Sequence, residues 1–181
     1  KDIQGRITRY TYDDTQRMTQ ITYPNKLAVG YTYDKLDRVT TMRDVRGNDT
    51  KIQYDKVGNV TSMIDPGNQV YKYTYDKKGN MTKEIDPLAA STEYRYNKND
   101  QVISIKDPTN AITKYQYDAR NLLSSITDAK GHTTKMAYDG NENLSESTDA
   151  KGNKERFEYD ALDRMTAAQN RLGQKSTYTY D

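Results

Sequence analysis

The residues in this chain that are best suited to catalysis are a single histidine and a large set of aspartates. His132 is the only histidine among 181 residues, and there is no cysteine. A lone histidine without a spaced second histidine or a cysteine does not supply a usual zinc ligand set. His132 stands at a place in a repeated pattern where Asn48 and Asn153 also occur. This placement favours a polar role at the edge of a turn over catalysis.

The aspartates recur at two fixed places in the pattern. Two carboxylates held close together could hydrolyse glycosides, and a carboxylate cluster could bind calcium. Turn-forming residues follow these aspartates, however, as in Asp76–Asn80 and Asp107–Pro108, and the EF-hand spacing is absent. Aspartate accepts hydrogen bonds from the first amides of a tight turn. The pattern therefore favours turn capping, and the sequence predicts no catalytic residue, no metal site and no cofactor.

Tyrosines form the third group of candidates. There are 17 tyrosines, against one phenylalanine and no tryptophan. Tyrosine rings beside asparagine and aspartate could stack on sugars. The same rings could pack across neighbouring strands, where each aromatic pair contributes about 0.2–1 kcal/mol. The sequence favours packing, and sugar binding stays open as the alternative.

The spacing of the tyrosines indicates the elements that must position all of these residues. Nine tyrosines, here called the marker tyrosines, follow one another at intervals of 21 residues; eight precede aspartate and one precedes asparagine. A fixed period of this size is typical of repeat architectures. The predicted structural motif comprises Tyr12, Asp13, Tyr33, Asp34, Tyr54, Asp55, Tyr75, Asp76, Tyr96, Asn97, Tyr117, Asp118, Tyr138, Asp139, Tyr159, Asp160, Tyr180 and Asp181.

Each repeat predicts two short strands and two turns. Thr113–Tyr117 alternates with period two and is built from strong strand formers. Asp76–Asn80 is typical of a tight turn, and the later Asp-Pro-x-Gly or Asp-x-x-Gly segments favour a type I turn. A second strand lies between the two turns. Its apolar residues stand six and, in most repeats, nine places after the marker tyrosine. In an ideal strand, residues at these two places would point to opposite faces of the sheet. Either a β-bulge or partial burial of both faces would reconcile this pattern.

These elements predict an all-β fold in which tandem 21-residue β-hairpins form a long, curved antiparallel sheet, a segment of a spiralling β-shell. Each hairpin would bury its apolar side against its neighbours, so that stability is collective. We expect residues 1–181 to be a single array of about eight repeats, cut from a longer array at both ends. Edge strands near Tyr10–Tyr12 and Tyr178–Tyr180 could then pair with other copies of the chain, an association that Lys1 and Lys175 would partly oppose.

The composition excludes some classes of function. Charged residues make up 30% of the chain with both signs interspersed, and the net charge is +2. This is not the basic block that nucleic-acid binding requires. No apolar run has the length of a membrane span, and no signal peptide is visible. The sequence therefore predicts neither nucleic acid nor a membrane span among the partners.

The unit at Tyr73–Pro87, Tyr-x-Tyr-Asp-x-x-Gly-Asn-x-Thr-x-x-x-Asp-Pro, resembles the YD repeat, also called the RHS repeat. The resemblance runs through the whole chain in phase. Three departures weaken single turns: Asn97 replaces the first aspartate, Tyr23 replaces the second, and Leu88–Ala90 lacks the turn glycine.

The resemblance implies that such arrays wind into large hollow β-shells, which in bacterial toxins enclose a C-terminal toxic domain. The composition, rich in lysine, tyrosine and asparagine, is similar to Gram-positive wall-associated toxins of contact-dependent inhibition. We therefore expect a non-enzymatic segment of a secreted or cell-surface shell in a bacterium, with the rest of the shell and an enclosed toxin domain as partners. The alternative is an extracellular adhesion or carbohydrate-binding module, similar in role to the animal teneurins, whose partner would be a surface glycan or receptor.

Overall fold

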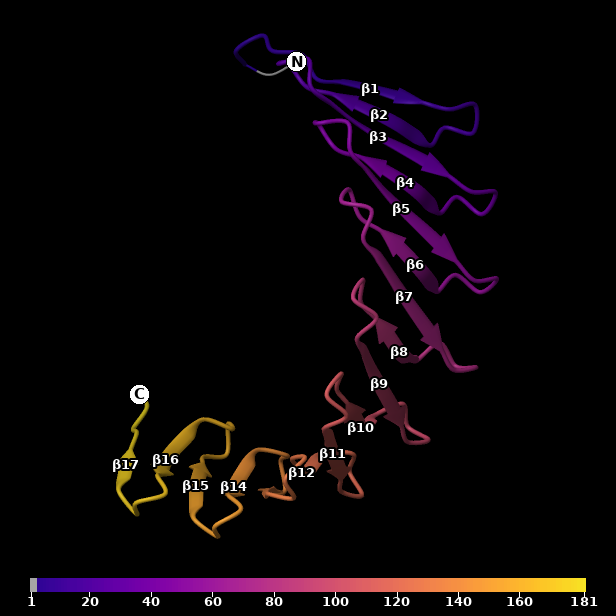
Figure 1. Cartoon of the computed structure of the whole chain (residues 1–181). Coiled ribbons are helices and arrows are strands. Elements are labelled where there is room, and N and C mark those ends of the chain that lie inside the picture. Colours follow the sequence, from indigo (N-terminus) through magenta and orange to yellow (C-terminus); the bar gives the residue numbers. More distant parts are fainter. Residues whose placement is uncertain (1–2) are drawn as a thin grey trace. The chain divides into compact units, whose positions relative to one another are not determined.

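A computed structural model describes residues 3–181, and within them every regular element is a strand. The all-β prediction is therefore confirmed, with seventeen strands where the sequence suggested about sixteen. All belong to one open antiparallel sheet (Figure 1). The strands are β1 (Arg9–Tyr12), β2 (Met18–Thr22), β3 (Ala28–Tyr33), β4 (Val39–Arg43), β5 (Asp49–Tyr54), β6 (Val60–Ile64), β7 (Val70–Tyr75), β8 (Met81–Ile85), β9 (Ser91–Tyr96), β10 (Val102–Lys106), β11 (Ile112–Tyr117), β12 (Leu123–Thr127), β13 (Thr133–Tyr138), β14 (Leu144–Thr148), β15 (Lys154–Tyr159), β16 (Met165–Gln169) and β17 (Lys175–Thr177).

The chain divides into two compact units, the first ending at Ser91 and the second running from Thr92 to Asp181. In the first unit each strand from β1 to β8 pairs antiparallel with the next strand in sequence. The second unit repeats this order from β9 to β17. Within each unit the successive hairpins are rotated relative to one another, so the sheet is twisted (Figure 1). The tandem-hairpin prediction is confirmed.

A β-bulge explains the apolar residues at the sixth and ninth places of each repeat. In β3 and β4, Tyr33 lies opposite Val39, whereas Tyr31 lies opposite Met42, because the register shifts by one residue between them. Directly opposed residues share a face of the sheet, so both apolar residues face the tyrosines. The same shift recurs in each of the eight hairpins that begin with an odd-numbered strand from β1 to β15.

The residue that the bulge inserts has a role of its own. In β4 it is Thr40, whose Oγ1 lies 3.0 Å from Oγ1 of Thr32 in the adjacent strand. Corresponding threonine pairs join Thr11 to Thr19 and Thr74 to Thr82. These hydroxyl contacts lie on the face opposite the tyrosines. The predominance of threonine and serine directly after the sixth-place apolar residue therefore has a structural reason.

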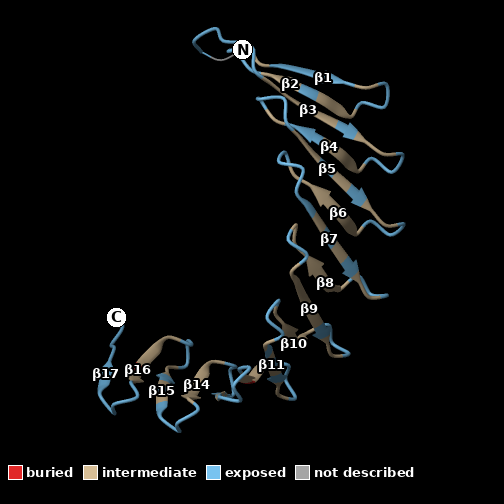
Figure 2. Cartoon of the chain, viewed as in Figure 1, coloured by how far each residue is buried: buried red, intermediate tan, exposed pale blue. Residues whose placement is uncertain are grey.

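The two faces of the sheet differ in exposure. In β7, β11 and β15 exposed and half-buried residues alternate, with the aromatic residues on the half-buried side. We call this side the tyrosine face and the other side, which carries Lys72, Lys114 and Arg156, the polar face. Only Ala167 and Ser125 are buried among the described residues (Figure 2). The fold is thus a single layer, held by contacts between neighbouring hairpins and without an enclosed core.

Both rows of turns have the same backbone. After Tyr33, the Asp34 amide donates to the Arg38 carbonyl and the Asp37 amide donates to the Asp34 carbonyl; Asp44, Gly47 and Asn48 repeat these bonds in the other row. The fourth residue of each turn has positive φ, as in Gly47 at 86° and Ala89 at 64°. This is a type I turn followed by a left-handed residue, a common three-residue hairpin loop. Alanine at that place stores strain, since left-handed backbone costs about 1–2 kcal/mol for a residue with a Cβ.

The predicted strand at Tyr178–Tyr180 is wrong in part. β17 covers only Lys175–Thr177, where it pairs with β16. The Tyr178 amide still donates to the Thr166 carbonyl at 2.9 Å. At the other end, β1 includes Tyr10 and Tyr12 as predicted, and Lys1 lies outside the described residues.

Candidate functional site

The repeated feature that carries most of the polar contacts is the junction between consecutive hairpins. The marker tyrosines from Tyr12 to Tyr159 each end an odd-numbered strand. The side chains of several marker tyrosines reach back over the preceding even-numbered strand. The Tyr33 hydroxyl donates to the Met18 carbonyl at 2.6 Å, fifteen residues earlier. The same bond is made by Tyr54, Tyr117, Tyr138, Tyr159 and Tyr180. The tyrosine thus fastens one repeat to the one before it.

The aspartate after each marker tyrosine holds the turn. Oδ1 of Asp34 accepts hydrogen bonds from the amides of Leu36 and Arg38 at 2.8 and 3.1 Å. Asp44, in the other row of turns, accepts from Arg46 and Asn48 in the same way. These carboxylates are engaged by their own turns. Within residues 3–181, no three or more His, Cys, Asp or Glu side chains gather in a way that could hold a metal ion.

Arginine four residues after the turn aspartate connects three groups, a role that the sequence did not reveal. Nε of Arg38 donates to Asp34 Oδ2 at 2.7 Å, and one terminal nitrogen donates to the carbonyl of Asp55 in the next repeat at 2.8 Å. The same guanidinium lies 4.6 Å from the ring centre of Tyr54, a cation–π contact. Arg17 stacks on Tyr33, and Arg164 on Tyr180, in the same manner.

Some repeats without this arginine are bridged to the next repeat by other side chains. Leu122 stands at the equivalent place in the repeat of Tyr117, and there Arg120 donates to the Asp139 carbonyl at 2.7 Å. Asn143 donates to Asp163 Oδ1 at 2.8 Å. A bridge between repeats can therefore be made by different residue types at different places in the turn.

The partner of the turn residue changes with the charge of that residue. Turn aspartates accept a side-chain bond from arginine, asparagine or histidine, as Asp55 does from Asn59 at 2.9 Å. Where asparagine replaces aspartate, the partner is glutamine: Nδ2 of Asn97 donates to Gln101 Oε1 at 2.9 Å, and Asn170 donates to Gln174 at 2.8 Å. The sequence contains this pairing as residues four apart, although the repeat pattern indicates Asn97 only as a departure that weakens its turn.

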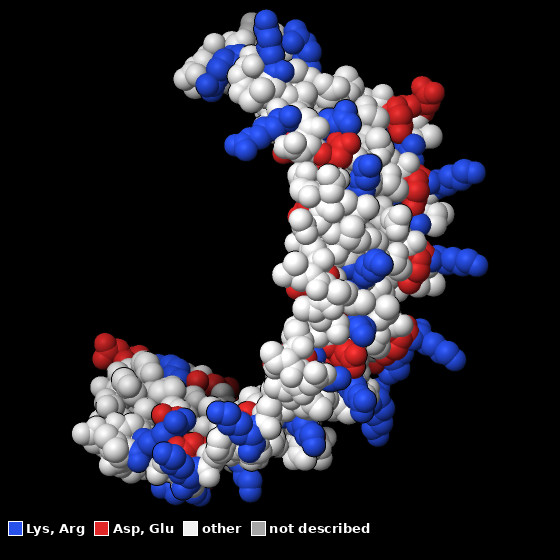
Figure 3. All heavy atoms as spheres, viewed as in Figure 1, with Lys and Arg blue, Asp and Glu red and all other residues white. Residues whose placement is uncertain are grey.

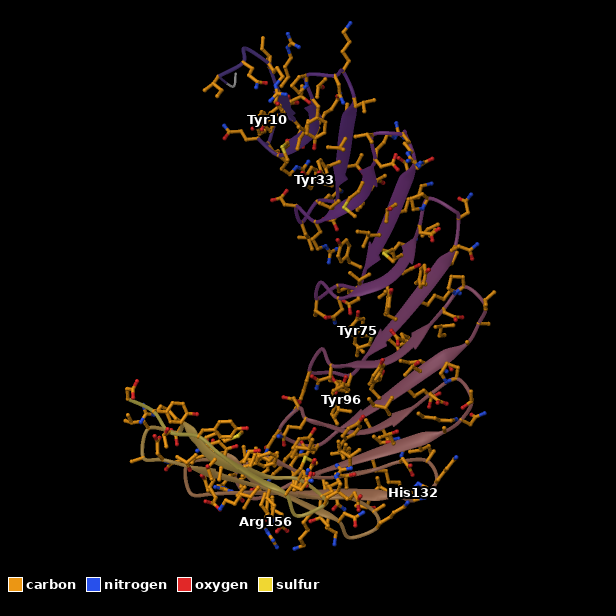
Figure 4. The ribbon with its side chains drawn as sticks, turned by 90° about the vertical axis from the view of Figure 1, so that its left-hand side faces the viewer. Tyr10, Tyr33, Tyr75, Tyr96, His132 and Arg156 are labelled. Atoms are coloured by element: carbon orange, nitrogen blue, oxygen red, sulfur yellow. The ribbon has the colours of Figure 1, made fainter. Side chains whose placement is uncertain are left out.

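His132 makes the same bond as the asparagines that stand in its place. Its Nδ1 lies 2.9 Å from Asp128 Oδ2, and Asn153 Nδ2 lies 2.9 Å from Asp149 Oδ2. The His132 side chain is 63% exposed. Within the second unit, Figure 4 shows Tyr96 near one row of turns and His132 at the other row. The histidine is thus part of a turn, as the repeat pattern indicated.

The electrostatics of the junction follow from these bonds. The Arg17 amide, together with the Thr15 and Arg17 side chains, lowers the pKa of Asp13 to about 2. The Arg38 side chain lowers the pKa of Asp34, and the His132 side chain lowers that of Asp128. Burial raises the pKa of the Tyr117 hydroxyl. Charges of both signs are spread along the chain, as Figure 3 shows for one side. The junction keeps its carboxylates ionised, which suits binding of turn amides and does not suit general acid catalysis.

The described residues contain no helix that is long and apolar enough to cross a membrane.

A one-layer sheet of identical hairpins, joined by a repeated polar junction, defines the class of structural repeat arrays. The sequence profile of the RHS Repeat family matches residues 1–28, 54–91, 96–134 and 138–175. The chain belongs to the RHS repeat family. Among curated proteins, none matches its sequence.

The fold is similar to that of a solved toxin structure. The chain aligns with the Tc holotoxin pore of Photorhabdus luminescens at 17% identity and a TM-score of 0.52, covering 91% of this chain and 11% of that one. It also aligns with the TcdB2-TccC3 crystal structure at 14% identity and a TM-score of 0.47, covering 93% of this chain and 15% of that one. At these identities the first alignment supports the fold alone, and the chain spans a small part of either protein.

Proposed function

We propose that residues 1–181 are one continuous, non-catalytic segment of a hollow RHS-repeat shell that encloses a C-terminal toxin domain and delivers it from a bacterial cell surface. The rest of the shell and the enclosed domain would be its partners. The observation that carries the proposal is the junction: most hairpins are fastened to a neighbour by a tyrosine hydroxyl, and several also by a side chain bound to the next turn. Such an array can extend over any number of repeats.

The chemistry of the repeat supports a structural role. The turn carboxylates and His132 are bonded within their own turns, and most marker-tyrosine hydroxyls have a carbonyl acceptor in the preceding repeat. Membership of the RHS repeat family and the fold shared with a Tc holotoxin chain support the shell. Secretion and attachment to a cell wall are inferred from the same family context.

Protection of a downstream domain tests this function. In a longer chain that contains this array and the sequence following it, limited proteolysis should spare the downstream domain. Deleting residues 55–117, which are three whole repeats, keeps the repeat phase while shortening the wall, and should make that domain sensitive. Equal sensitivity with and without the deletion would contradict enclosure.

The alternative function is an adhesion or carbohydrate-binding module that uses the tyrosine face. Tyr10, Tyr12, Tyr178 and Tyr180 are between 46% and 59% exposed, so some rings remain open to a sugar. A glycan array probed with residues 1–181 separates the two functions. Binding that is lost when an exposed ring is removed, as in Tyr12→Ala, would favour the alternative.

A further inference from the structure

Gly30 stands in the middle of a strand, at a place where the other hairpins carry a charged side chain. It lies on the polar face of β3, and within residues 3–181 it is the only glycine in a strand. The equivalent residue in every other odd-numbered strand from β1 to β15 is charged; these residues are Arg9, Lys51, Lys72, Glu93, Lys114, Lys135 and Arg156. A glycine weakens a strand, because it has no side chain to pack and loses more conformational entropy on folding.

The sheet itself does not require a glycine at this place. The φ of Gly30 lies outside the left-handed region, and the residue pairs in register with Gln20 and Arg43, so it is not part of the bulge. A Cβ here would meet Arg43 Cβ at 3.6 Å and the Thr19 carbonyl oxygen at 3.7 Å, which are ordinary contacts. The remaining reason for a glycine inside a strand is the close approach of another group.

The missing side chain leaves a hollow of about 440 Å³ in the polar face. The hollow is many times larger than the roughly 30 Å³ that one water molecule occupies in the liquid, so it has room for a side chain from a partner. Three small residues of β3, Ala28, Gly30 and Thr32, belong to its lining. Together they form a trough along this strand.

The two residues opposite Gly30 are both engaged elsewhere. Nε2 of Gln20 donates to Thr22 Oγ1 at 3.1 Å on its own strand. Nε and a terminal nitrogen of Arg43 donate to the two carboxylate oxygens of Asp49 at 2.7 and 2.8 Å. The hollow therefore exists before any partner binds, and a guanidinium of fixed position belongs to its lining.

An aromatic ring fits this arrangement. A ring can cover the backbone of a strand glycine, and a guanidinium is attracted to the face of a ring within about 6 Å. The junctions of this chain already use that contact, as when Arg38 lies 4.6 Å from the ring centre of Tyr54. Among the described residues no ring lies against the Arg43 guanidinium, so this position is open to a ring from a partner.

Cations flank the hollow on both sides. Arg9 and Lys51 occupy the same place in β1 and β5 that Gly30 occupies in β3. Neighbouring strands are about 4.8 Å apart, so each cation lies about 10 Å from Gly30 along the array. Neither makes an ion pair or a side-chain hydrogen bond with any residue in 3–181. The one carboxylate on the polar face of β1–β5 is Asp49, which is bound to Arg43. This surface therefore attracts anionic groups.

We propose that the polar face of β1–β5 binds an acidic peptide segment in the polyproline II conformation. An aromatic ring of the segment covers Gly30, and carboxylates three residues before and after the ring contact Arg9 and Lys51. A polyproline II helix has about three residues per turn and rises about 3.1 Å per residue, so side chains three apart share a face at about 9 Å. This spacing matches the about 10 Å between equivalent places of successive hairpins. In a regular strand, side chains three apart would point to opposite sides.

NMR titration of isotope-labelled residues 1–181 with the end-blocked peptide Glu-Pro-Pro-Phe-Pro-Pro-Glu tests the proposal. The amide signals of Gly30 and Arg43 should shift and saturate at millimolar peptide. Gly30→Val fills the floor of the hollow without changing the charge, and should raise the dissociation constant at least about tenfold. The matched control is Gln53→Val, which adds the same side chain to the polar face of β5 outside the hollow and should change the dissociation constant less than about twofold.

Thermal melting separates loss of the site from loss of the fold. Gly30→Val should melt no lower than wild type, because valine favours strands and the added Cβ meets only ordinary contacts.

Two altered peptides separate the ring from the charges. Replacing the phenylalanine by alanine, or both glutamates by glutamine, should weaken binding at least about fivefold in each case. Added salt should also weaken binding of the original peptide.

Three results would overturn the proposal. One is the absence of a saturable shift at Gly30 with millimolar peptide. Another is equal affinity of wild type and Gly30→Val, which would place the peptide elsewhere. The third is equal affinity for the original peptide and its alanine variant, which would show attraction by charge alone.

Discussion

At the scale of single residues, the marker tyrosine and the turn residue after it hold the array together through side-chain-to-backbone bonds. The tyrosine combines a half-buried ring with a hydroxyl that has a defined acceptor in the preceding repeat. One side-chain oxygen of the turn residue accepts hydrogen bonds from amides of its own turn. The other end of the side chain bonds to the side chain four residues later. Both roles can be measured separately by substitutions that remove the tyrosine ring, the tyrosine hydroxyl, or the hydrogen bond between the turn residue and its side-chain partner.

Tyr138 separates the ring from the hydroxyl. Its hydroxyl donates to the Leu123 carbonyl at 2.9 Å, so Tyr138→Phe should destabilise by about 0.5–1.5 kcal/mol, the usual net value of one hydrogen bond. Tyr138→Ala also removes the ring and should cost about 2–3 kcal/mol, less than a fully buried aromatic because the sheet is one layer thick. Urea melts measure both changes. If Tyr138→Ala melts like wild type, the ring has no structural role.

Asn97 tests the matching of turn partners, since the common residue at its place is aspartate. Gln101 accepts from Asn97 through Oε1 and donates through Nε2 to the Asn121 carbonyl at 2.8 Å. Asn97→Asp removes the donor, and rotating the glutamine amide to compensate would break its bond to Asn121. We therefore expect this change toward the common residue to destabilise by about 1 kcal/mol.

The double variant Asn97→Asp, Gln101→Arg recreates the aspartate–arginine pair of Asp34 and Arg38 and should recover most of that loss. Thermal melts of the single and double variants provide the comparison. A stable single variant, or no recovery in the double variant, would contradict the matching rule.

At the scale of elements, two turns and a bulge define each hairpin, and the sequence predicted the turns better than the bulge. Alternating strand formers and Asp-x-x-Gly turns located the odd-numbered strands from β1 to β15, because period two and turn chemistry are local properties. The sequence alone could not distinguish a bulge at Thr40 from burial of both faces of the strand, because the register depends on the neighbouring strand. The bridges of Arg38 and Arg120 were also missed, because they join repeats and vary in place.

Ala89 is one of several turn residues whose backbone conformation conflicts with the residue type. Its φ of 64° is left-handed, which glycine adopts without strain. Ala89→Gly should therefore stabilise the chain by about 0.5–1 kcal/mol, the relieved strain less the added chain entropy of glycine. Ala90→Gly, at a place without positive φ, is the control and should destabilise by about 0.4–1 kcal/mol. Melts in urea would contradict this account if both substitutions had the same sign.

At the scale of the whole molecule, the junctions repeat along the chain, so conditions that affect one affect many. The pKa of Asp13 falls from its ordinary 3.8 to about 2 because the Arg17 amide binds it; the Arg38 side chain lowers that of Asp34, and the Arg164 amide that of Asp160. A carboxyl with a lowered folded pKa stabilises above its unfolded pKa and loses that contribution as pH falls through the folded value.

The melting temperature should therefore be nearly constant above about pH 5 and fall progressively between about pH 4 and pH 2. Circular dichroism melts at a series of pH values measure this. A melting temperature that stays constant down to pH 2 would show that the turn carboxylates contribute little to stability.

The central claim is that this array is part of the wall of a shell with a domain inside it. The most direct test is the structure, by electron cryomicroscopy, of a longer chain that contains this array and the sequence after it. The account predicts that these hairpins continue into neighbouring repeats as one wall around a hollow that contains density for the following domain. An open ribbon with the following domain outside it, accessible to solvent, would contradict the claim.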